Sequence, residues 1–197
     1  MPLDLEIVIV SWNVVDLLRD CLNSIYDAPD VHSDADGILH LGSYTAKVHV
    51  VDNASTDGSA QMVWERFPKV NLIASSENLG FTRGNNLALR QCQARYVLLL
   101  NPDTRVVGDA LTKMLDYMEH HSDVAVLGPQ LRHEDGSLQS SRRRFPTFMT
   151  ALMESTLLQQ WFPKNRWVQR YYLQDVSTDQ VQDVDWVTGA CMLVRRD

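Results

Sequence analysis

An alternation of apolar runs with amphipathic segments constrains the fold of this chain more than any other feature of its sequence. The apolar runs have the length of buried strands and occupy residues 5–10, 48–51, 70–74 and 96–100. Between them, apolar residues recur at helical spacing over residues 14–26, and a further helix is predicted over 82–92. Thr56 or Asp57 can cap another helix that runs to about Phe67. Strands that alternate with helices predict an α/β fold, with a mostly parallel central sheet and helices on both faces.

The pattern is less regular in the remaining segments. A helix is predicted over 106–118, a strand over 124–127, a hairpin over 131–138 that turns at Asp135-Gly136, a helix over 147–162 and a final strand over 186–194. Residues 28–46 contain Pro29, two glycines and three acids, which predicts a surface insertion before the second strand.

Composition narrows the class of protein. A length of 197 residues suits one domain, and a net charge of −7 argues against nucleic acid as a partner. The three cysteines are far apart and form no Cys-x-x-Cys pair, which predicts neither a disulfide framework nor a zinc site but a reducing, cytoplasmic setting. The first residues are acidic where a signal peptide is basic, and no apolar run approaches the roughly 18 residues of a membrane span.

Polar residues follow directly where two of the apolar runs end. The run Leu98-Leu99-Leu100 stops at Asn101-Pro102-Asp103, and Val50-Val51 stops at Asp52-Asn53. Open α/β sheets bind ligands at the carboxyl ends of their parallel strands. The sequence therefore predicts a binding site at this edge, with a small molecule as its ligand.

Four motifs in register connect this edge to a known family. They are Val10-Ser11-Trp12-Asn13, the stretch 51–59, Glu77-Asn78-Leu79-Gly80 and Leu100-Asn101-Pro102-Asp103, and their order and positions resemble family 2 glycosyltransferases. The resemblance implies the GT-A nucleotide-diphospho-sugar transferase fold as a single domain over 1–197, with a nucleotide-binding part at about 1–104 and an acceptor-side part at about 105–197. Weaker motifs at 128–131, 135–139, 142–146 and 185–190 are similar to bacterial rhamnosyltransferase-type members.

The resemblance implies a set of nucleotide-binding residues. They are Ser11, Trp12, Asn13, Asp52, Asn53, Ser55, Asn78, Gly80, Arg83, Gly84, Asn86 and Asn101. Asp52 would accept a hydrogen bond from the pyrimidine N3–H or the ribose, and Ser11, Trp12 and Asn13 would line the base pocket. The loop and helix start after the third strand would approach the donor through glycine and a helix N-terminus, where Arg83 replaces the arginine that relatives carry at the position of Asn85. Helix capping by Asp52 or Asn13, and ordinary solvation of Arg83, remain open alternatives.

The resemblance also implies a divalent cation, Mg²⁺ or Mn²⁺, held by Asp103 against the donor diphosphate. Such a metal neutralises the charge that develops on the nucleoside-diphosphate leaving group. Asn101 stands where the family has the first acid of a pair. A role of Asp103 in capping the helix over 106–118 is the alternative.

The acceptor side of the implied site is less defined. Asp185 and Trp186, with Gly189-Ala190, match the stretch that borders the sugar and acceptor in relatives, so Asp185 is a candidate catalytic residue and Trp186 a candidate stacking residue. A strand-edge acid and a core tryptophan are equally ordinary readings. Relatives carry their general base in a Glu-Asp motif further along, and this sequence ends at Asp197, so we expect a donor-binding portion that is incomplete at its C-terminus.

The implied function is that of an inverting glycosyltransferase of bacterial cell-wall or polysaccharide biosynthesis. It would transfer a hexose, with rhamnose as a candidate, from a dTDP- or UDP-sugar to a saccharide or lipid-linked acceptor. The alternative is a non-catalytic nucleotide-sugar-binding or scaffold module. Nucleotidyltransferases and dinucleotide-dependent dehydrogenases fit less well, because Val10-Ser11-Trp12-Asn13 is not a glycine-rich loop. Arg142–Arg144 and the apolar segment after them leave open a peripheral contact with the inner face of the membrane, and packing or a homodimer contact.

Overall fold

The computed structural model describes residues 3–156, 158–162 and 165–196, and they form two compact units. The first unit comprises residues up to 127 together with the segment from 189 onward, and the second comprises 128–188. The predicted division near residue 104 is a functional one and stays a prediction. Among the described residues, no helix has both the length and the apolar character needed to cross a membrane.

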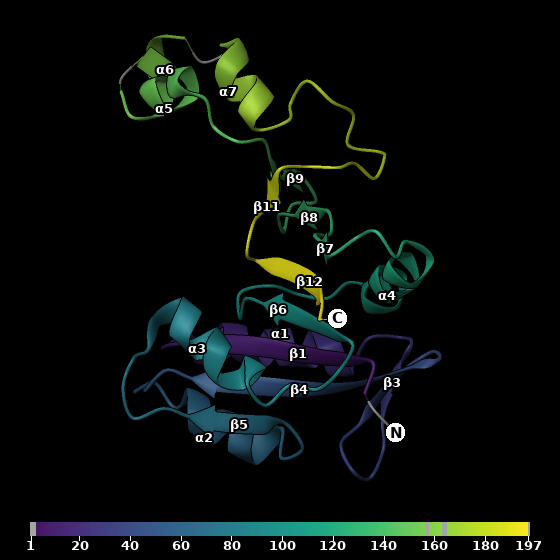
Figure 1. Ribbon diagram of the computed structural model, residues 1–197. Helices are drawn as coiled ribbons and strands as arrows, with labels where there is room; N and C mark the ends of the chain where they lie inside the picture. Colours follow the sequence, from purple (N-terminus) through teal and green to yellow (C-terminus); the bar gives the residue numbers. More distant parts are fainter. Residues whose placement is uncertain (1–2, 157, 163–164, 197) are drawn as a thin grey trace. The chain divides into compact units, whose positions relative to one another are not determined.

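An eight-stranded sheet forms the centre of the first unit (Figure 1). Its strands are β1 (Leu5–Ser11), β2 (Val31–Ser33), β3 (Leu39–Leu41), β4 (Tyr44–Asp52), β5 (Asn71–Ala74), β6 (Tyr96–Leu100), β7 (Val126–Leu127) and β12 (Cys191–Arg195). The order is β2-β3-β4-β1-β6-β12-β7, and β5 pairs with β4. Neighbours β5, β4, β1 and β6 run parallel, whereas the β2–β3 hairpin and β12 add antiparallel pairs on either side. The predicted α/β class is confirmed.

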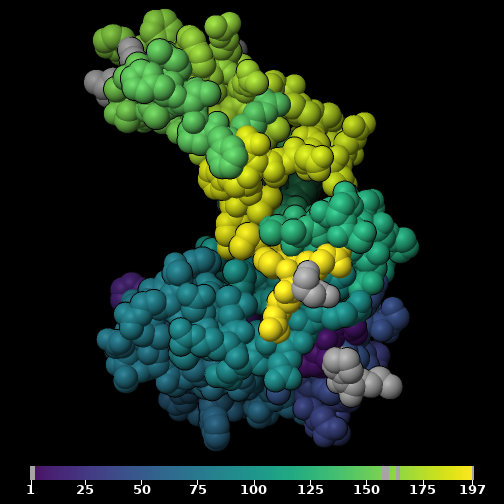
Figure 2. Space-filling view, in the orientation of Figure 1, coloured from purple at the N-terminus to yellow at the C-terminus, as the bar shows by residue number. Residues whose placement is uncertain are grey.

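Four helices belong to this unit: α1 (Val15–Tyr26), α2 (Ser59–Arg66), α3 (Gly80–Leu89) and α4 (Ala110–His120). Figure 1 draws α3 in front of the sheet and α1 behind it. Val8 packs with Ala88 of α3 on one face, while Ile7 and Ile9 point to the other because side chains alternate along a strand, and all are fully buried. In the view of Figure 2, the residues coloured purple are visible only as small patches.

Residues 28–46 are not a surface insertion, as the glycines, proline and acids of this stretch had suggested. They form the β2–β3 hairpin and the start of β4, so the central sheet continues through them. Leu39 and Leu41 are fully buried on β3. The acids of this stretch include Asp34, whose Oδ1 accepts from the backbone N–H groups of Asp36 and Ile38 in the hairpin turn, so they are turn residues of an ordered element.

Helix boundaries differ from the predictions at several ends. The helix α3 starts at Gly80 and ends at Leu89, so it begins two residues earlier and ends three residues earlier than predicted. The helix α4 starts only at Ala110, because residues 101–109 first form turns after β6. The strand expected over 70–74 and the one over 96–100 are found within one residue.

Within the described residues of the second unit, the helices and strands are short. They are β8 (Leu131–Arg132), β9 (Leu138–Gln139), β10 (Arg142–Arg143), α5 (Phe148–Glu154), α6 (Leu158–Trp161), α7 (Arg166–Tyr171) and β11 (Trp186–Val187). The predicted hairpin at Asp135-Gly136 is confirmed as β8–β9.

Two predictions in this region are wrong. The single helix expected over 147–162 is two helices, since α5 ends at Glu154, and Leu157 of that prediction lies outside the described residues. The strand expected over 186–194 is also divided, because β11 pairs with β10 while β12 pairs with β6.

Candidate functional site

The parallel strands of the first unit bring the predicted polar residues to one edge. Ser11 ends β1 and lies opposite Asp52, the last residue of β4. The next strand along the sheet, β6, ends before Asn101, whose backbone N–H donates to the Ala190 carbonyl at 2.9 Å. Residues far apart in sequence, including Gly189-Ala190, thus meet at the carboxyl edge where parallel sheets bind ligands.

Three buried side-chain oxygens at this edge accept or donate no hydrogen bond within the described part of the chain. They are Ser11 Oγ, Asp52 Oδ1 and Asn53 Oδ1. Buried polar atoms almost always have partners, and an unpaired one costs about 1–3 kcal/mol. Asp52 and Asn53 offer acceptors, so the edge suits a ligand that presents N–H or O–H donors.

The other oxygen of Asp52 has a structural partner. Asp52 Oδ2 accepts from the Ser55 backbone N–H at 3.0 Å and so shapes the turn after β4. Asp52 does not cap α2, because that helix begins only at Ser59, whose backbone N–H donates to Asp57 Oδ1 instead.

Asn13 and Ser55 hold the two loops that follow β1 and β4 together. Thr56 N donates to Asn13 Oδ1 at 2.7 Å, and Asn13 N donates to Ser55 Oγ at 3.0 Å. Asn13 adopts a left-handed backbone with φ +53°, a conformation that asparagine tolerates. It does not cap α1, since that helix receives its cap from Asp57. Trp12 is 54% exposed beside these loops.

The loop after β5 and the start of α3 pack closely on the same edge. Asn53 Nδ2 donates to the Gly80 carbonyl at 3.3 Å. A Cβ at Gly84 would lie 2.9 Å from Val10 Cγ1, so only glycine fits this approach of helix to strand. Asn78 Oδ1 accepts from Gly80 N and orders the turn that begins α3.

The polar side chains of α3 divide between solvent and interior. Arg83 is exposed, with its guanidinium 3.4 Å from Glu77 Oε1, and Asn86 is also exposed. Asn85 is buried and donates to the Phe81 carbonyl at 2.9 Å, so this side chain faces the protein. A basic contact from α3 to a donor would therefore come from Arg83.

The residues after β6 fit a divalent cation. Asp103 is exposed, and its carboxylate accepts no hydrogen bond from any residue that the structure describes. The Asn101 carbonyl is occupied by Thr104 Oγ1 at 2.8 Å, which fixes the turn. Mg²⁺ and Mn²⁺ are bound by one or two carboxylates together with substrate phosphates and water, so a single Asp103 is an adequate protein ligand. Asp103 does not cap α4, which starts seven residues later.

A second cluster of ligand-type side chains, Glu6, His49 and Cys92, is buried within the sheet. Glu6 Oε2 accepts from Gln93 N and Ala94 N, and Oε1 lies 3.1 Å from His49 Nε2. Burial raises the pKa of the Cys92 thiol to about 12. Because its acceptors are occupied and its thiol is protonated, this cluster is a hydrogen-bond network rather than a metal site. A glutamate within the apolar run 5–10 was the only sequence signal for it.

The predicted acceptor-side residues lie in the second unit. Asp185 Oδ2 accepts from Phe145 N at 2.7 Å, which leaves its other oxygen free of bonds within the described residues. Trp186 is 39% exposed, and its ring lies 5.8 Å from the guanidinium of Arg143, which is also 4.4 Å from the Tyr172 ring. The stretch 185–186 therefore has a structural role in this unit, and its contact with an acceptor stays a prediction.

The three arginines 142–144 make contacts within the same unit. Arg142 donates to the Ser177 carbonyl, Arg143 lies among aromatic rings, and Arg144 pairs with Asp175 at 2.9 Å. These contacts agree with a packing role for the three arginines, which is one of the interpretations that the sequence left open beside a membrane contact.

Known proteins resemble this chain in sequence. The sequence model of the family "Glycosyl transferase family 2" matches residues 6–196. The N-acetylglucosaminyl-diphospho-decaprenol L-rhamnosyltransferase of Mycobacterium tuberculosis is 30% identical over 160 residues, which cover 76% of this chain and 52% of that protein. The chain thus spans about half the length of this curated relative.

Solved structures share the fold. Staphylococcus aureus TarS 1–349 in complex with UDP-GlcNAc has a TM-score of 0.55 at 23% identity, covering 71% of this chain and 38% of that one. The mannosyltransferase PcManGT from Pyrobaculum calidifontis, in complex with GDP-Man and Mn²⁺, has a TM-score of 0.52 at 21% identity, covering 68% and 36%. The match of the family model to nearly the whole sequence, on this GT-A fold, shows that the chain belongs to glycosyl transferase family 2.

Proposed function

We propose that this chain binds the nucleotide-sugar donor of an inverting glycosyltransferase that takes a hexose from a UDP- or dTDP-sugar. Rhamnose is the sugar we favour, because the relative from M. tuberculosis is named as a rhamnosyltransferase. Membership of the family and the order of the four motifs support the donor site. The acceptor we propose is a saccharide or a lipid-linked saccharide at the cytoplasmic face of a bacterial membrane.

The observation that carries this proposal is the unpaired Oδ1 of Asp52. A buried carboxylate oxygen without a donor is costly, and the pyrimidine N3–H or a ribose hydroxyl is a donor that relieves the cost. Ser11 lies opposite Asp52 in the register of β1 and β4, which supports a contact of its hydroxyl with the same nucleoside. Uracil and thymine share the N3–H, which is why both nucleotides remain in the proposal.

The diphosphate would lie toward Asp103 and the start of α3. When a divalent cation is bound, it supplies charge neutralisation for the leaving nucleoside diphosphate. Asp103 would hold this cation, and Arg83 at the exposed side of α3 would add positive charge near the phosphates. Asn101, a neutral amide, would orient the donor without adding a second negative charge.

Nucleotide binding tests the proposal directly. Thermal unfolding is measured with UDP, dTDP, GDP and NAD, each with and without Mn²⁺, and a nucleotide at about 100 times its Kd adds roughly 2.7 kcal/mol to the folded state. We expect stabilisation by UDP or dTDP. It should be lost in Asp52→Asn, because the single amide oxygen keeps the bond from the Ser55 backbone N–H and an NH₂ donor replaces the unpaired oxygen.

A matched pair of variants isolates the metal. Asp103→Ala should abolish the Mn²⁺ dependence, whereas Asp109→Ala, which removes another exposed carboxylate before α4, should preserve it. A chain that responds to no nucleotide, or equally to NAD, would overturn the proposed function.

We also propose a contact of the second unit with an anionic bilayer. Phe145, Phe148, Trp161 and Phe162 are between 57% and 77% exposed. Residues 142–172 contain six Lys and Arg residues and a single acid, Glu154, although the whole chain has a net charge of −7. Three of the six, Arg142–Arg144, also make contacts within the unit, and Arg144 pairs with Asp175. Aromatic and basic residues together suit an interface with anionic lipid.

Flotation with vesicles tests this contact. Binding to phosphatidylglycerol vesicles but not to phosphatidylcholine vesicles, and its loss in Phe148→Ser, is the expected result. Self-association without vesicle binding would show that the same residues form a homodimer contact instead.

A further inference from the structure

Asp57 connects two loops that the sequence assigned to separate elements. Its Oδ2 accepts from the Val15 backbone N–H at 2.8 Å, in the first turn of α1. Its Oδ1 accepts from Ser59 N at 3.0 Å and from Ser59 Oγ at 2.6 Å, in the first turn of α2. One carboxylate therefore caps both helices that follow β1 and β4.

The helices capped in this way follow the loops that carry the proposed nucleoside contacts. The loop after β1 contains Ser11 to Asn13, and the loop after β4 contains Asp52 to Ser55. Between these loops, Asn13 N donates to Ser55 Oγ and Thr56 N donates to Asn13 Oδ1. We name the bonds made by Asn13 and Asp57 between the two loops the loop clasp.

The loop clasp holds backbone that is otherwise unfavourable. Asn13 and Ala54 have φ angles of +53° and +58°, which are two of the three left-handed non-glycine residues in the described chain. Such conformations persist only where surrounding contacts determine them. Hydrogen bonds from Ser59 and Val15 outweigh the opposing effect of burial and hold the pKa of Asp57 below its usual value, so the carboxylate is ionised at neutral pH.

We propose that Asp57 is a positioning residue for the nucleoside: by capping α1 and α2 together, it holds the loop that carries Trp12 and Asn13 against the loop that carries Asn53 to Ser55. This inference rests on the proposed nucleotide site. Asp57 itself contacts backbone and Ser59 only, so it acts through the loops and not through the ligand.

The chain contains a matched control for this role. Asp135-Gly136-Ser137 repeats the sequence Asp57-Gly58-Ser59, and Asp135 Oδ1 likewise accepts from Ser137 N at 2.8 Å and Ser137 Oγ at 2.6 Å. Asp135 receives no bond from a second segment among the described residues. The two aspartates thus differ in the one feature that the proposal invokes.

The test is a pair of isosteric substitutions, Asp57→Asn and Asp135→Asn. An amide has a single acceptor oxygen, so Asp57→Asn retains the cap of one helix and loses the other, while Asp135→Asn retains both of its bonds. Dissociation constants are measured by calorimetry for UDP or dTDP, whichever binds the unmodified chain, and for Mn²⁺ with inorganic pyrophosphate. Circular dichroism at the same temperature confirms that each variant is folded.

We expect Asp57→Asn to raise the Kd of the nucleotide about tenfold and to leave pyrophosphate binding unchanged, because the loop clasp shapes the nucleoside end and Asp103 the phosphate end. Asp135→Asn should change neither dissociation constant.

Equal weakening of nucleotide and pyrophosphate binding, or unchanged nucleotide binding in folded Asp57→Asn, would overturn the role of Asp57. If Asp57→Asn does not fold, Val15→Pro, which removes the N–H that Asp57 Oδ2 accepts at the first residue of α1, a helix position that tolerates proline, provides the same comparison. No nucleotide binding by the unmodified chain would contradict the donor site itself, which is a separate outcome.

Discussion

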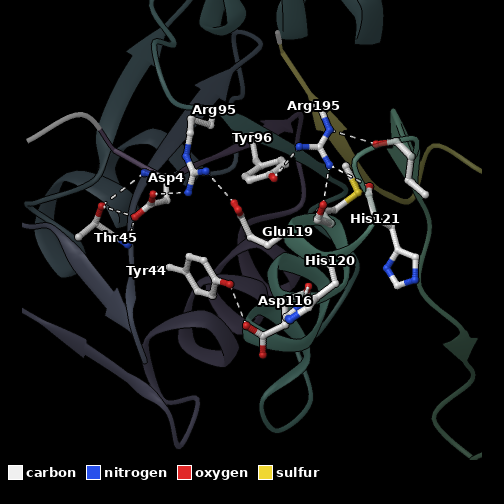
Figure 3. Close-up of polar contacts among 12 residues, drawn as sticks. Asp4, Tyr44, Thr45, Arg95, Tyr96, Asp116, Glu119, His120, His121 and Arg195 are labelled. Carbon is white, nitrogen blue, oxygen red and sulfur yellow. Dashed lines mark hydrogen bonds and ion pairs between the residues drawn. The ribbon is translucent and has the colours of Figure 1, made fainter.

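The two edges of the central sheet differ in how their polar groups are satisfied. At the carboxyl edge, Ser11, Asp52 and Asn53 each bury an oxygen without a partner in the described chain. At the amino edge, where β1, β4 and β6 begin, polar groups pair with one another (Figure 3). At the amino edge of the sheet, the polar groups are thus satisfied by contacts within the protein. At its carboxyl edge, buried oxygens lack hydrogen-bond partners in the described chain.

Figure 3 shows the amino edge in detail. Asp4 accepts from Thr45 and pairs with Arg95, and Arg95 reaches Glu119 of α4 at 2.8 Å. Arg195 on β12 donates to the Tyr96 hydroxyl and to the carbonyls of Met118, His121 and Val124, so it anchors the last turn of α4. The comparison teaches that contacts for stability gather at one edge, while unsatisfied and left-handed residues gather at the other, where a ligand is expected.

The largest effect on stability is expected when the buried hydrogen bonds of Glu6 are removed. In Glu6→Ala, the backbone N–H groups of Gln93 and Ala94 and the His49 ring lose their buried acceptor. We expect a loss of about 3–5 kcal/mol of unfolding free energy, measured by urea denaturation. Glu65→Ala removes an exposed glutamate whose partner is Gln61 and should change stability little. A similar small change in Glu6→Ala would show that the network does not stabilise the sheet.

A smaller loss is expected for Arg195→Met, which keeps the length of the side chain but removes its donors. The carbonyls at the end of α4 then turn to water, because this region is partly exposed. About 1–3 kcal/mol of unfolding free energy should be lost, with faster hydrogen exchange in the last turn of α4. Unaltered exchange in that turn would contradict the anchoring role of Arg195.

The pH dependence of stability tests the same network with a milder change. Burial, only partly offset by Glu6, lowers the pKa of His49 below its usual value of 6.5. The unfolded chain therefore binds a proton that the folded chain resists, so stability should fall as pH drops below about 7 through the unfolded pKa, by at most about 1.4 kcal/mol per pH unit. No further loss of stability from His49 is expected once the pH is below its pKa in the folded state. Denaturation midpoints between pH 5 and 8 measure this slope, and His49→Gln should flatten it; an unchanged slope in that variant would assign the effect to other groups.

The smallest effect on stability is expected at the carboxyl edge. Ser11→Ala removes a buried hydroxyl that has no partner within the described chain, so the unfolding free energy should change by less than about 1 kcal/mol or rise slightly. Nucleotide affinity should fall in the same variant. A large loss of stability would mean that Ser11 has a bonded partner, such as a buried water, and that the polar groups at this edge are satisfied as they are at the amino edge.

The pattern of apolar residues along the sequence predicted the helices and strands that bury their side chains at regular intervals. The run 96–100 is a strand in the structure at the same residues, since an apolar segment of this length can be buried on both faces. The wrong predictions occurred where local composition competes with tertiary pairing. Turn residues in 28–46 concealed the β2–β3 hairpin, which is stabilised by burying Leu39 and Leu41 against β4. The mostly apolar stretch 186–194 did not reveal that its two ends pair with different strands.

The same division applies to the candidate site. The positions of Asp52 and Asp103 at strand ends followed from the sequence, because parallel strands connected by helices must end at one edge. Asp57 was read as a cap of one helix, and its bond to Val15 could not be inferred, since residues 42 positions apart meet only when β1 and β4 pair.

The sequence by itself determined the α/β alternation, the edge at which polar residues gather and the family of the chain, because hydrophobic period and motif order are properties of the linear chain. Only the tertiary structure decided which polar atoms are satisfied. Asp52 and Glu6 are both acids in or at the end of apolar strands, yet one retains a free buried oxygen and the other has every oxygen bonded. That difference depends on which distant backbone N–H groups folding brings within about 3 Å of each carboxylate.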